Sequence, residues 1–349
     1  MSTFFKSVHI TNFKSLKDVT LNDCKRINLL IGKPNVGKSN ILEALGLFSL
    51  PYFQYNTSKK LTQFVRLENI AELFFDGNID EKISISTDDN NFCSVSYLKQ
   101  EGLVQFDMDL KRQKPNSEIT SDIYNLIADN QLKLKFGKRR FYPFHSKVKY
   151  YKFPHTALSK KQNSSIIGLF SLTPPSGINL LDVIERDKFL TNELSRLFSE
   201  YDLKLLFDKT NDTLRIMKVL RNDNEMISFP YSSIADTLQR IIFFKAAIAS
   251  NKDSILLFEE PEAHCFPPYI AHFTQEVINS TSNQFFIATH SPYVLNDFLE
   301  NERDDVAIFM ADFKDGQTLI NRLTDDEVNE VYDYGIDVFF NYERFTTHG

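Results

Sequence analysis

Hydrophobic residues near the start of the chain follow two different periods in succession. Residues 27–31 are hydrophobic at four of five positions, which is typical of a strand buried on both faces. Gly32 ends this run, and over residues 39–48 hydrophobic side chains such as Ile41 and Leu45 recur at the spacing of a helix. The pattern therefore predicts a buried strand, a turn and an amphipathic helix, in that order.

Further along the chain, β-branched and alternating segments give way to helices that alternate with buried strands. We expect further strands at about 4–13, 19–21, 82–86, 92–98, 103–110, 147–153, 203–207, 213–220, 225–229, 255–258 and 285–288. Helices are expected at about 119–129, 179–200, 236–250 and 269–280. Because strands and helices alternate at both ends, the sequence predicts an α/β fold with a mainly parallel core sheet, an antiparallel β lobe and a helical insertion.

This order of elements predicts a discontinuous core. Residues 1–50 and 231–320 are expected to form it together, and residues 51–230 to form the intervening β lobe and helical insertion. We expect the tail, residues 321–349, to pack on the core.

The composition is that of an ordinary globular protein. Of 349 residues, 42% are hydrophobic and 25% charged, and the net charge of −6 argues against a surface that coats nucleic acid. Apolar runs fall short of the ~20 residues that a membrane helix needs, and the N-terminus lacks the apolar stretch of a secretory signal. Cys24, Cys93 and Cys265 are too scattered to suggest a disulfide framework or a zinc site. We therefore expect a cytoplasmic protein without a membrane partner.

The turn after the first buried strand carries a complete phosphate-binding pattern, G-x-x-x-x-G-K-[ST]. Glycines let backbone N–H groups close around phosphate oxygens, the lysine neutralises the β- and γ-phosphates, and the hydroxyl ligates Mg²⁺. The setting between a strand and a helix supports ATP binding over the alternative of a decayed loop kept only as a turn. The predicted nucleotide-binding residues are Gly32, Lys33, Pro34, Asn35, Val36, Gly37, Lys38, Ser39 and Asn40.

A second candidate element is an acidic strand end. The buried strand 255–258 leads into Glu259 and Glu260, and carboxylates at the carboxyl end of a strand lie where α/β sheets bind ligands. We assign Glu259, with Ser39, to Mg²⁺, and Glu260 to the general base that polarises the attacking water. The alternative is a solvated acidic turn. His290, just beyond the strand 285–288, is a candidate γ-phosphate sensor, although a lone histidine is more often structural.

Together these elements resemble the ABC-type ATPases of the RecF/SMC group, and within it the ATPases related to the overcoming-lysogenisation-defect (OLD) proteins. The similarity rests on FKSVHITNFKS before the P-loop, on Asn35 and Asn40 around it, on EEPEAHCFPP and on ATHSPYVL. The resemblance implies a homodimer in which two ATP molecules lie between one subunit's P-loop and the other's signature segment. That segment would begin at Ser233.

This chain departs from the family pattern at several positions. Glu259 replaces the usual Asp, Ala235 replaces the glycine of the Ser-x-Gly signature, and Phe266 stands where a histidine often follows the acidic turn. The glutamine loop that completes the metal shell could not be placed. OLD nucleases append a metal-dependent TOPRIM domain, and the stretch after His290 is too short for one. We therefore expect any nuclease or toxin activity to reside on a separate effector chain.

Residues 131–161 form a basic, aromatic segment with ten Lys or Arg and no Asp or Glu. Positive charge for phosphates and rings for stacking are what a nucleic-acid groove uses, so Lys133–Lys161 is a candidate nucleic-acid site. The alternative is a pair of exposed strands whose aromatic side chains point inward while lysines protect the edge.

These observations favour an ATP-hydrolysing head that dimerises and controls an effector, in prokaryotic anti-phage defence or DNA maintenance. A non-catalytic scaffold that binds ATP and holds a nuclease or toxin is the main alternative, and Ala235 favours it. A GTP switch is disfavoured because residues 251–254 lack the final Asp of Asn-Lys-x-Asp. A small-molecule kinase is disfavoured because the middle of the chain shows no substrate lid.

Overall fold

The computed structural model describes residues 4–113, 119–137, 146–154, 170–220 and 225–346. The chain divides into two compact units. The first unit comprises Met1–Tyr150, Asp253–Glu260 and Thr281–Gly349, and the second comprises Tyr151–Lys252 and Pro261–Ser280. Residues 51–150, expected in an intervening lobe, thus belong to the same unit as the predicted P-loop.

The first unit contains a six-stranded sheet in the order β16-β15-β3-β14-β13-β9. Strands β15, β3, β14 and β13 run parallel to one another, and β16 is antiparallel to β15. All five residues of β3 and of β14 are buried, as expected of parallel strands covered on both faces. The expected α/β fold with a parallel core is confirmed. The strands are β3 Ile27–Ile31, β9 Val148–Tyr151, β13 Ile255–Glu259, β14 Gln284–Ala288, β15 Val306–Lys314 and β16 Gln317–Arg322.

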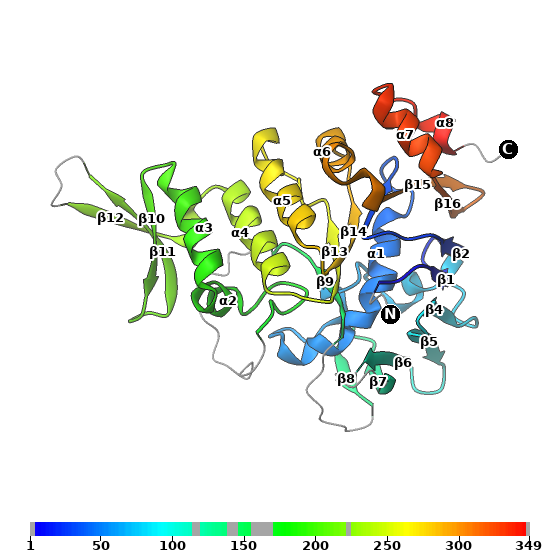
Figure 1. Ribbon diagram of the computed structural model, residues 1–349. Helices are drawn as coiled ribbons and strands as arrows, with labels where there is room; N and C mark the ends of the chain where they lie inside the picture. The colour runs from blue at the N-terminus through cyan, green and yellow to red at the C-terminus, as the bar shows by residue number, and fades with distance from the viewer. Residues whose placement is uncertain (1–3, 114–118, 138–145, 155–169, 221–224, 347–349) are drawn as a thin grey trace. The chain divides into compact units, whose positions relative to one another are not determined.

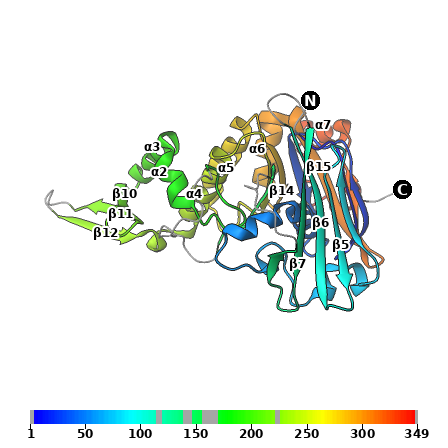
Figure 2. The same cartoon turned by 90° about the horizontal axis from the view of Figure 1, so that it is seen from below.

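A second sheet of the first unit has seven strands, paired in the order β2-β1-β4-β5-β6-β7-β8, and β5, β6 and β7 lie side by side in Figure 2. Every neighbouring pair is antiparallel. The expected strands near 82–86, 92–98 and 103–110 are confirmed. The bounds are β1 Val8–Phe13, β2 Leu16–Leu21, β4 Ile83–Thr87, β5 Phe92–Leu98, β6 Leu103–Gln113, β7 Ile119–Ala128 and β8 Leu134–Phe136.

The helix predicted over 119–129 is wrong, because this segment is strand β7. Its buried residues Tyr124, Leu126 and Ala128 alternate with more exposed ones, and the strand pairs with β6 along its whole length. The alternation has a period of two, which fits a sheet with one buried face and not a helix.

Helices of the first unit cover its sheets. Helix α1 spans Lys38–Gly46, contacts β13 and β14, and continues into a 3₁₀ segment, Leu47–Tyr55, that contains Pro51 (Figure 1). The other α-helices in the described part of this unit are α6 Pro292–Glu302, α7 Asp325–Asp333 and α8 Tyr342–Thr346.

The second unit combines helices with a small antiparallel sheet, β10-β11-β12. The helix expected over 179–200 is divided at Asp187, whose carboxylate accepts hydrogen bonds from the N–H groups of Phe189 and Leu190 and so caps a new helix. The elements are α2 Leu180–Arg186, α3 Lys188–Ser199, β10 Leu203–Asp208, β11 Thr213–Val219, β12 Met226–Pro230, α4 Asp236–Ala249 and α5 Pro267–Asn279.

Close packing between α1 and β9 gives a test of the fold. A Cβ atom at Gly46 would lie 2.5 Å from Cδ1 of Tyr150, a fully buried ring. Helix propensity alone predicts that Gly46→Ala stabilises the protein by ~1 kcal/mol. We expect the opposite, a loss of ~1–3 kcal/mol, because the ring must be displaced in a packed core. Urea unfolding of the wild type and the variant measures the difference in their free energies of unfolding. A more stable variant would show that the Tyr150 ring can move aside at little cost.

Candidate functional site

Three neighbouring parallel strands bring the predicted site together. In the register of the sheet, Glu259 at the end of β13 lies beside Ala288 of β14, and Ala288 lies beside Leu30 of β3. The N–H of Glu260 donates to the carbonyl of Ala288 at 2.9 Å, and the N–H of Thr289 donates to the carbonyl of Leu30 at 3.2 Å. The P-loop, the acidic pair and the histidine segment therefore leave the sheet at the same edge, where α/β sheets bind ligands.

The P-loop places a buried lysine at the start of α1. Asn35 and Gly37 have φ angles of 62° and 102°, and these left-handed conformations turn the chain sharply before the helix begins. The ammonium of Lys38 donates to the carbonyls of Gly32 and Lys33, both at 2.8 Å, and the residue is only 5% exposed. A cation is thus held within the turn next to a helix N-terminus, an arrangement suited to phosphate.

Two polar side chains without an assigned role, Ser15 between β1 and β2 and Thr318 of β16, support the P-loop. Thr318 donates to the carbonyl of Val36 at 2.9 Å and lies 2.6 Å from the hydroxyl of Ser15. Asn40 donates to the same Ser15 hydroxyl at 2.7 Å. A side chain at Gly37 would collide with Thr318, since its Cβ would lie 2.1 Å from the threonine Oγ1. The NFKS motif contained Ser15, but nothing in the sequence pointed to Thr318.

The two carboxylates at the end of β13 have different surroundings. The side chain of Glu259 is 11% exposed; it accepts a hydrogen bond from the hydroxyl of Tyr150 at 3.2 Å and forms an ion pair with Arg66. Glu260 is 48% exposed and its Oε1 lies 3.6 Å from Nε2 of His290. Its φ of 42° is unusual for a residue other than glycine, and such conformations are held in place by their surroundings. The inner carboxylate is thus fixed, and the outer one faces solvent beside the histidine.

Burial and nearby charge change the proton affinity of the two basic groups. Burial lowers the pKa of Lys38 to about 8, against the opposing influence of the carboxylates of Glu260 and Glu259. Burial also lowers the pKa of His290, and the Lys38 charge adds to this effect while Glu260 opposes it. His290 is therefore neutral at pH 7, so one ring nitrogen is left to accept a hydrogen bond.

The residues present fit a nucleotide with Mg²⁺. Among the described residues no group of three or more His, Cys, Asp or Glu side chains could hold a metal ion. Mg²⁺ commonly takes only one or two protein oxygen ligands together with phosphate oxygens and water. The hydroxyl of Ser39 and the carboxylate of Glu259 would supply such oxygens, and Lys38 would neutralise phosphate charge.

Of the residues predicted to bind nucleotide or metal or to act in catalysis, only Ser233 belongs to the second unit. It ends a 3₁₀ turn, Tyr231–Ser233, two residues before Ala235, the N-cap position of α4. The backbone of Ala235 has a φ of −53°, which any residue adopts, so this conformation does not require a glycine. The assignment of Ser233 to a nucleotide stays a prediction.

Parts of the basic, aromatic segment belong to the core. Tyr150 and Tyr151, two aromatic residues of this segment, are fully buried and so are not accessible to nucleic-acid bases, which fits the alternative of aromatic side chains that point inward. Phe136 packs against Phe53 with ring centroids 5.0 Å apart, and Lys149 is buried within β9. On the edge strand β8 and just before it, Lys135 and Lys133 are exposed, which fits the edge-protection alternative. Residues 138–145 and 155–161 of the segment lie outside the described residues.

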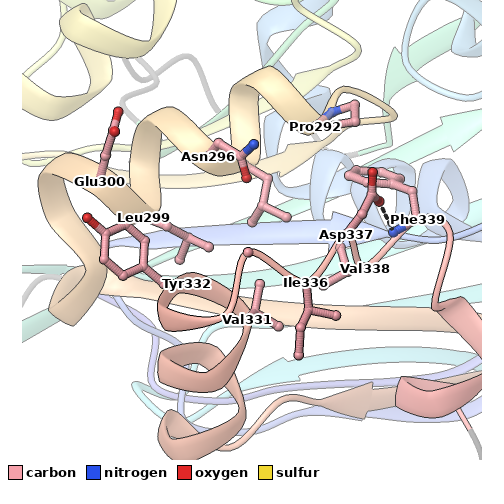
Figure 3. A pocket seen from close by; sticks show the side chains of 12 residues that line it. Pro292, Asn296, Leu299, Glu300, Val331, Tyr332, Ile336, Asp337, Val338 and Phe339 are labelled. Carbon is pink, nitrogen blue, oxygen red and sulfur yellow. Dashed lines mark hydrogen bonds between the residues drawn. The ribbon is translucent and has the colours of Figure 1, made fainter.

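A groove of the first unit lies beyond the histidine segment. Figure 3 shows Pro292, Asn296 and Leu299 of α6 facing Val331 and Ile336. Its lining includes none of the P-loop residues, so it is distinct from the nucleotide site.

Residues 27–296 match the protein family described as "AAA domain, putative AbiEii toxin, Type IV TA system". The match includes the P-loop, the acidic strand end and His290. The chain belongs to this family. Among curated proteins it is similar to the uncharacterized protein MJECL10 of Methanocaldococcus jannaschii, with 26% identity over 98 residues. That similarity covers 26% of this chain and 45% of the relative, so the chain spans less than half of the relative's length.

Solved structures of SMC heads share the fold of this family member. An SMC head bound to the C-terminal domain of ScpA, derived from Pyrococcus furiosus, superposes with a TM-score of 0.54 at 13% identity, over 95% of this chain and 99% of that one. An SMC head bound to the C-winged helix domain of ScpA gives 0.50 at 14% identity, over 93% and 99%. The α/β fold expected from the resemblance to the RecF/SMC group is thus confirmed, and the family match identifies an AAA domain.

The lowered pKa of Lys38 gives a test of its role. Free protein loses the Lys38 proton as the pH rises through about 8, and a bound phosphate favours the charged form. ATP binding at pH 9 should therefore take up about one proton, and affinity should fall by up to about tenfold per pH unit above 8. Calorimetry in buffers of different ionisation enthalpy measures the uptake. Lys38→Ala, which lacks the cation, should bind weakly at every pH; affinity that is constant from pH 7 to 10 would refute the assignment.

Proposed function

We propose that this protein is an ATP-binding and ATP-hydrolysing head. The observation that carries the proposal is the meeting of Lys38, Glu260 and His290 at one edge of the parallel sheet, with Glu260 and His290 3.6 Å apart. A P-loop that only bound nucleotide would not need a half-exposed carboxylate beside a neutral histidine.

Each residue has a role that follows from its surroundings. Lys38 binds the β- and γ-phosphates, and Ser39 and Glu259 would hold Mg²⁺, which when bound neutralises charge that develops on the phosphates. Glu260 accepts the proton of the attacking water, since it is the more exposed of the two carboxylates. His290 contacts the γ-phosphate and orients the water beside Glu260. The side chain of Glu259 is longer than that of the Asp usual in the family, and its contacts with Arg66 and Tyr150 keep the carboxylate ordered.

We also propose that two heads form a homodimer with ATP between them and that the dimer controls a separate effector. The SMC heads of similar fold are described as bound to domains of ScpA, a separate protein, and the family description includes a putative toxin. Ser233 would reach the partner's nucleotide at the start of α4. A nuclease or toxin effector in prokaryotic anti-phage defence or DNA maintenance, in the cytoplasm, fits this arrangement.

Among the described residues no helix is long and apolar enough to cross a membrane.

One observation favours a second function, an ATP-binding scaffold with little turnover. Ala235 adds a methyl group at the position where the resemblance implies a glycine that approaches the partner's γ-phosphate. The backbone there is compatible with any residue, so the methyl group and not backbone strain would limit that approach. Slow turnover with a stable ATP-bound dimer would follow.

Substitution of the proposed base separates binding from hydrolysis. Glu260→Gln keeps the size and hydrogen-bonding reach of the side chain but cannot accept a proton. We expect ATP affinity close to wild type, hydrolysis lowered by ~10²–10⁴-fold, and an ATP-bound dimer in light scattering. Glu262→Gln, two residues further on, is the matched control and should hydrolyse ATP normally. If Glu260→Gln retains near wild-type turnover, Glu260 is not the base.

Nucleic-acid binding by the basic segment is a separate prediction. The test variant carries Gln at five basic positions, Lys133, Lys135, Lys138, Arg139 and Arg140. Lys149 is left unchanged because it is buried, and Lys147 because it pairs with Asp89. If the segment binds DNA or RNA, the wild-type log–log slope of affinity against salt should be about −0.7 to −0.9 per phosphate contacted, and the variant should be shallower. Lys204→Gln with Lys218→Gln, on the second unit, is the control. If the wild-type protein shows no salt-sensitive binding to DNA or RNA, the nucleic-acid hypothesis is wrong and the lysines protect an edge strand.

A further inference from the structure

The carboxylate of Glu259 is held through both of its oxygens. Arg66 forms an ion pair and hydrogen bond with Oε1, and the hydroxyl of Tyr150 donates to Oε2 at 3.2 Å. The Tyr150 ring is fully buried against α1, so its hydroxyl is a fixed donor. Both oxygens of the Glu259 carboxylate therefore accept a hydrogen bond, which fixes the orientation of the group.

The backbone of Arg66 is anchored to the P-loop helix. Its N–H donates to Oε1 of Glu43 at 3.0 Å, and its carbonyl accepts from the ammonium of Lys14 at 2.6 Å. Lys14 in turn donates to Oε2 of Glu43 at 2.5 Å. Glu43 is 1% exposed and lies in α1, five residues after Lys38. The ion pair between Lys14 and the buried Glu43 of the P-loop helix therefore fixes the point from which the arginine side chain reaches Glu259.

We propose that Arg66 is a positioning residue for the metal-binding carboxylate, and that Glu43 and Lys14 hold it for that purpose. The inference rests on the proposed function, in which Glu259 and Ser39 hold Mg²⁺. Carboxylates that bind metals are commonly oriented by a second set of hydrogen bonds, and loss of such a partner costs ~10–100-fold in metal affinity. Arg66 and Tyr150 together fix the Glu259 side chain in one orientation before the metal arrives.

An arginine beside a metal ligand could instead compete with the metal for the carboxylate. The two roles predict opposite results: without its competitor the metal binds more tightly, and without its positioning residue it binds less tightly. The anchored backbone favours positioning, because Glu43 and Lys14 keep Arg66 within reach of Glu259 whether or not a metal is bound. Arg66 is also the donor with a planar, charged group suited to a carboxylate.

The test compares the affinity of the full chain for the non-hydrolysable analogue AMP-PNP with and without Mg²⁺, measured by calorimetry in magnesium and in EDTA. The ratio of the two dissociation constants is the contribution of the metal. In Arg66→Ala we expect the ratio of the dissociation constant in EDTA to that in magnesium to fall by ~10–100-fold. If the wild-type ratio is smaller than this, it should fall to one. The affinity in EDTA itself should change by less than about threefold. Arg66→Lys keeps the charge but not the planar group, and its ratio should lie between those of the wild type and Arg66→Ala.

Arg303→Ala is the matched control, since Arg303 is an arginine of the first unit that pairs with Asp333, and it should behave as wild type. Thermal unfolding shows whether each variant is folded. If Arg66→Ala does not fold, Tyr150→Phe serves in its place: it removes the hydrogen bond from the Tyr150 hydroxyl to Glu259 and should also lower the ratio. An unchanged ratio overturns the proposal, as does a larger one, which would make Arg66 a competitor. Equal weakening in EDTA would also overturn it. If the wild type binds no nucleotide, the proposed function falls as well.

Discussion

The site depends on the hydrogen-bond register of three parallel strands. Strands β3, β14 and β13 are neighbours, and each ends within one residue of the same line across the sheet. The hydrogen bonding continues past the strand ends, where the N–H groups of Glu260 and Thr289 donate to the neighbouring strands β14 and β3. A shift of one residue would turn each side chain to the opposite face and separate the P-loop from the acidic pair. Segments more than two hundred residues apart in sequence therefore meet because of backbone pairing.

Electrostatic balance is the second constraint on the site. Lys38 is buried, and its nearest acidic neighbours counteract only part of the cost of burying a charge, so its pKa remains lowered. A triphosphate would supply the missing negative charge. On the other side, Arg66 compensates the charge of Glu259, which leaves Glu260 as the exposed carboxylate next to His290. The site thus separates a carboxylate that is held from one that faces solvent, and this separation supports the different roles proposed for them.

Elements with a strong local signal could be predicted from the sequence. The P-loop, the buried strands and the strand ends at Glu259 and His290 depend on short motifs, and the structure brings them together. The contributions of Arg66, Glu43 and Thr318 could not be found, since their roles depend on contacts between segments distant in the chain. Strand β7 was mistaken for a helix because Ile123 and Ile127, which lie on its more exposed face, obscure the alternation in the sequence. Tyr150 shows the same limit: its basic neighbours suggested a surface, whereas the fold buries it beneath α1.

The central claim is that the site hydrolyses ATP. The direct measurement is steady-state phosphate release from the purified full chain with ATP and Mg²⁺, over a range of protein concentrations that spans dimer formation. The account predicts turnover that depends on Mg²⁺ and whose rate per chain rises with protein concentration. Tight ATP binding without phosphate release at any concentration would contradict it and identify the protein as an ATP-binding scaffold.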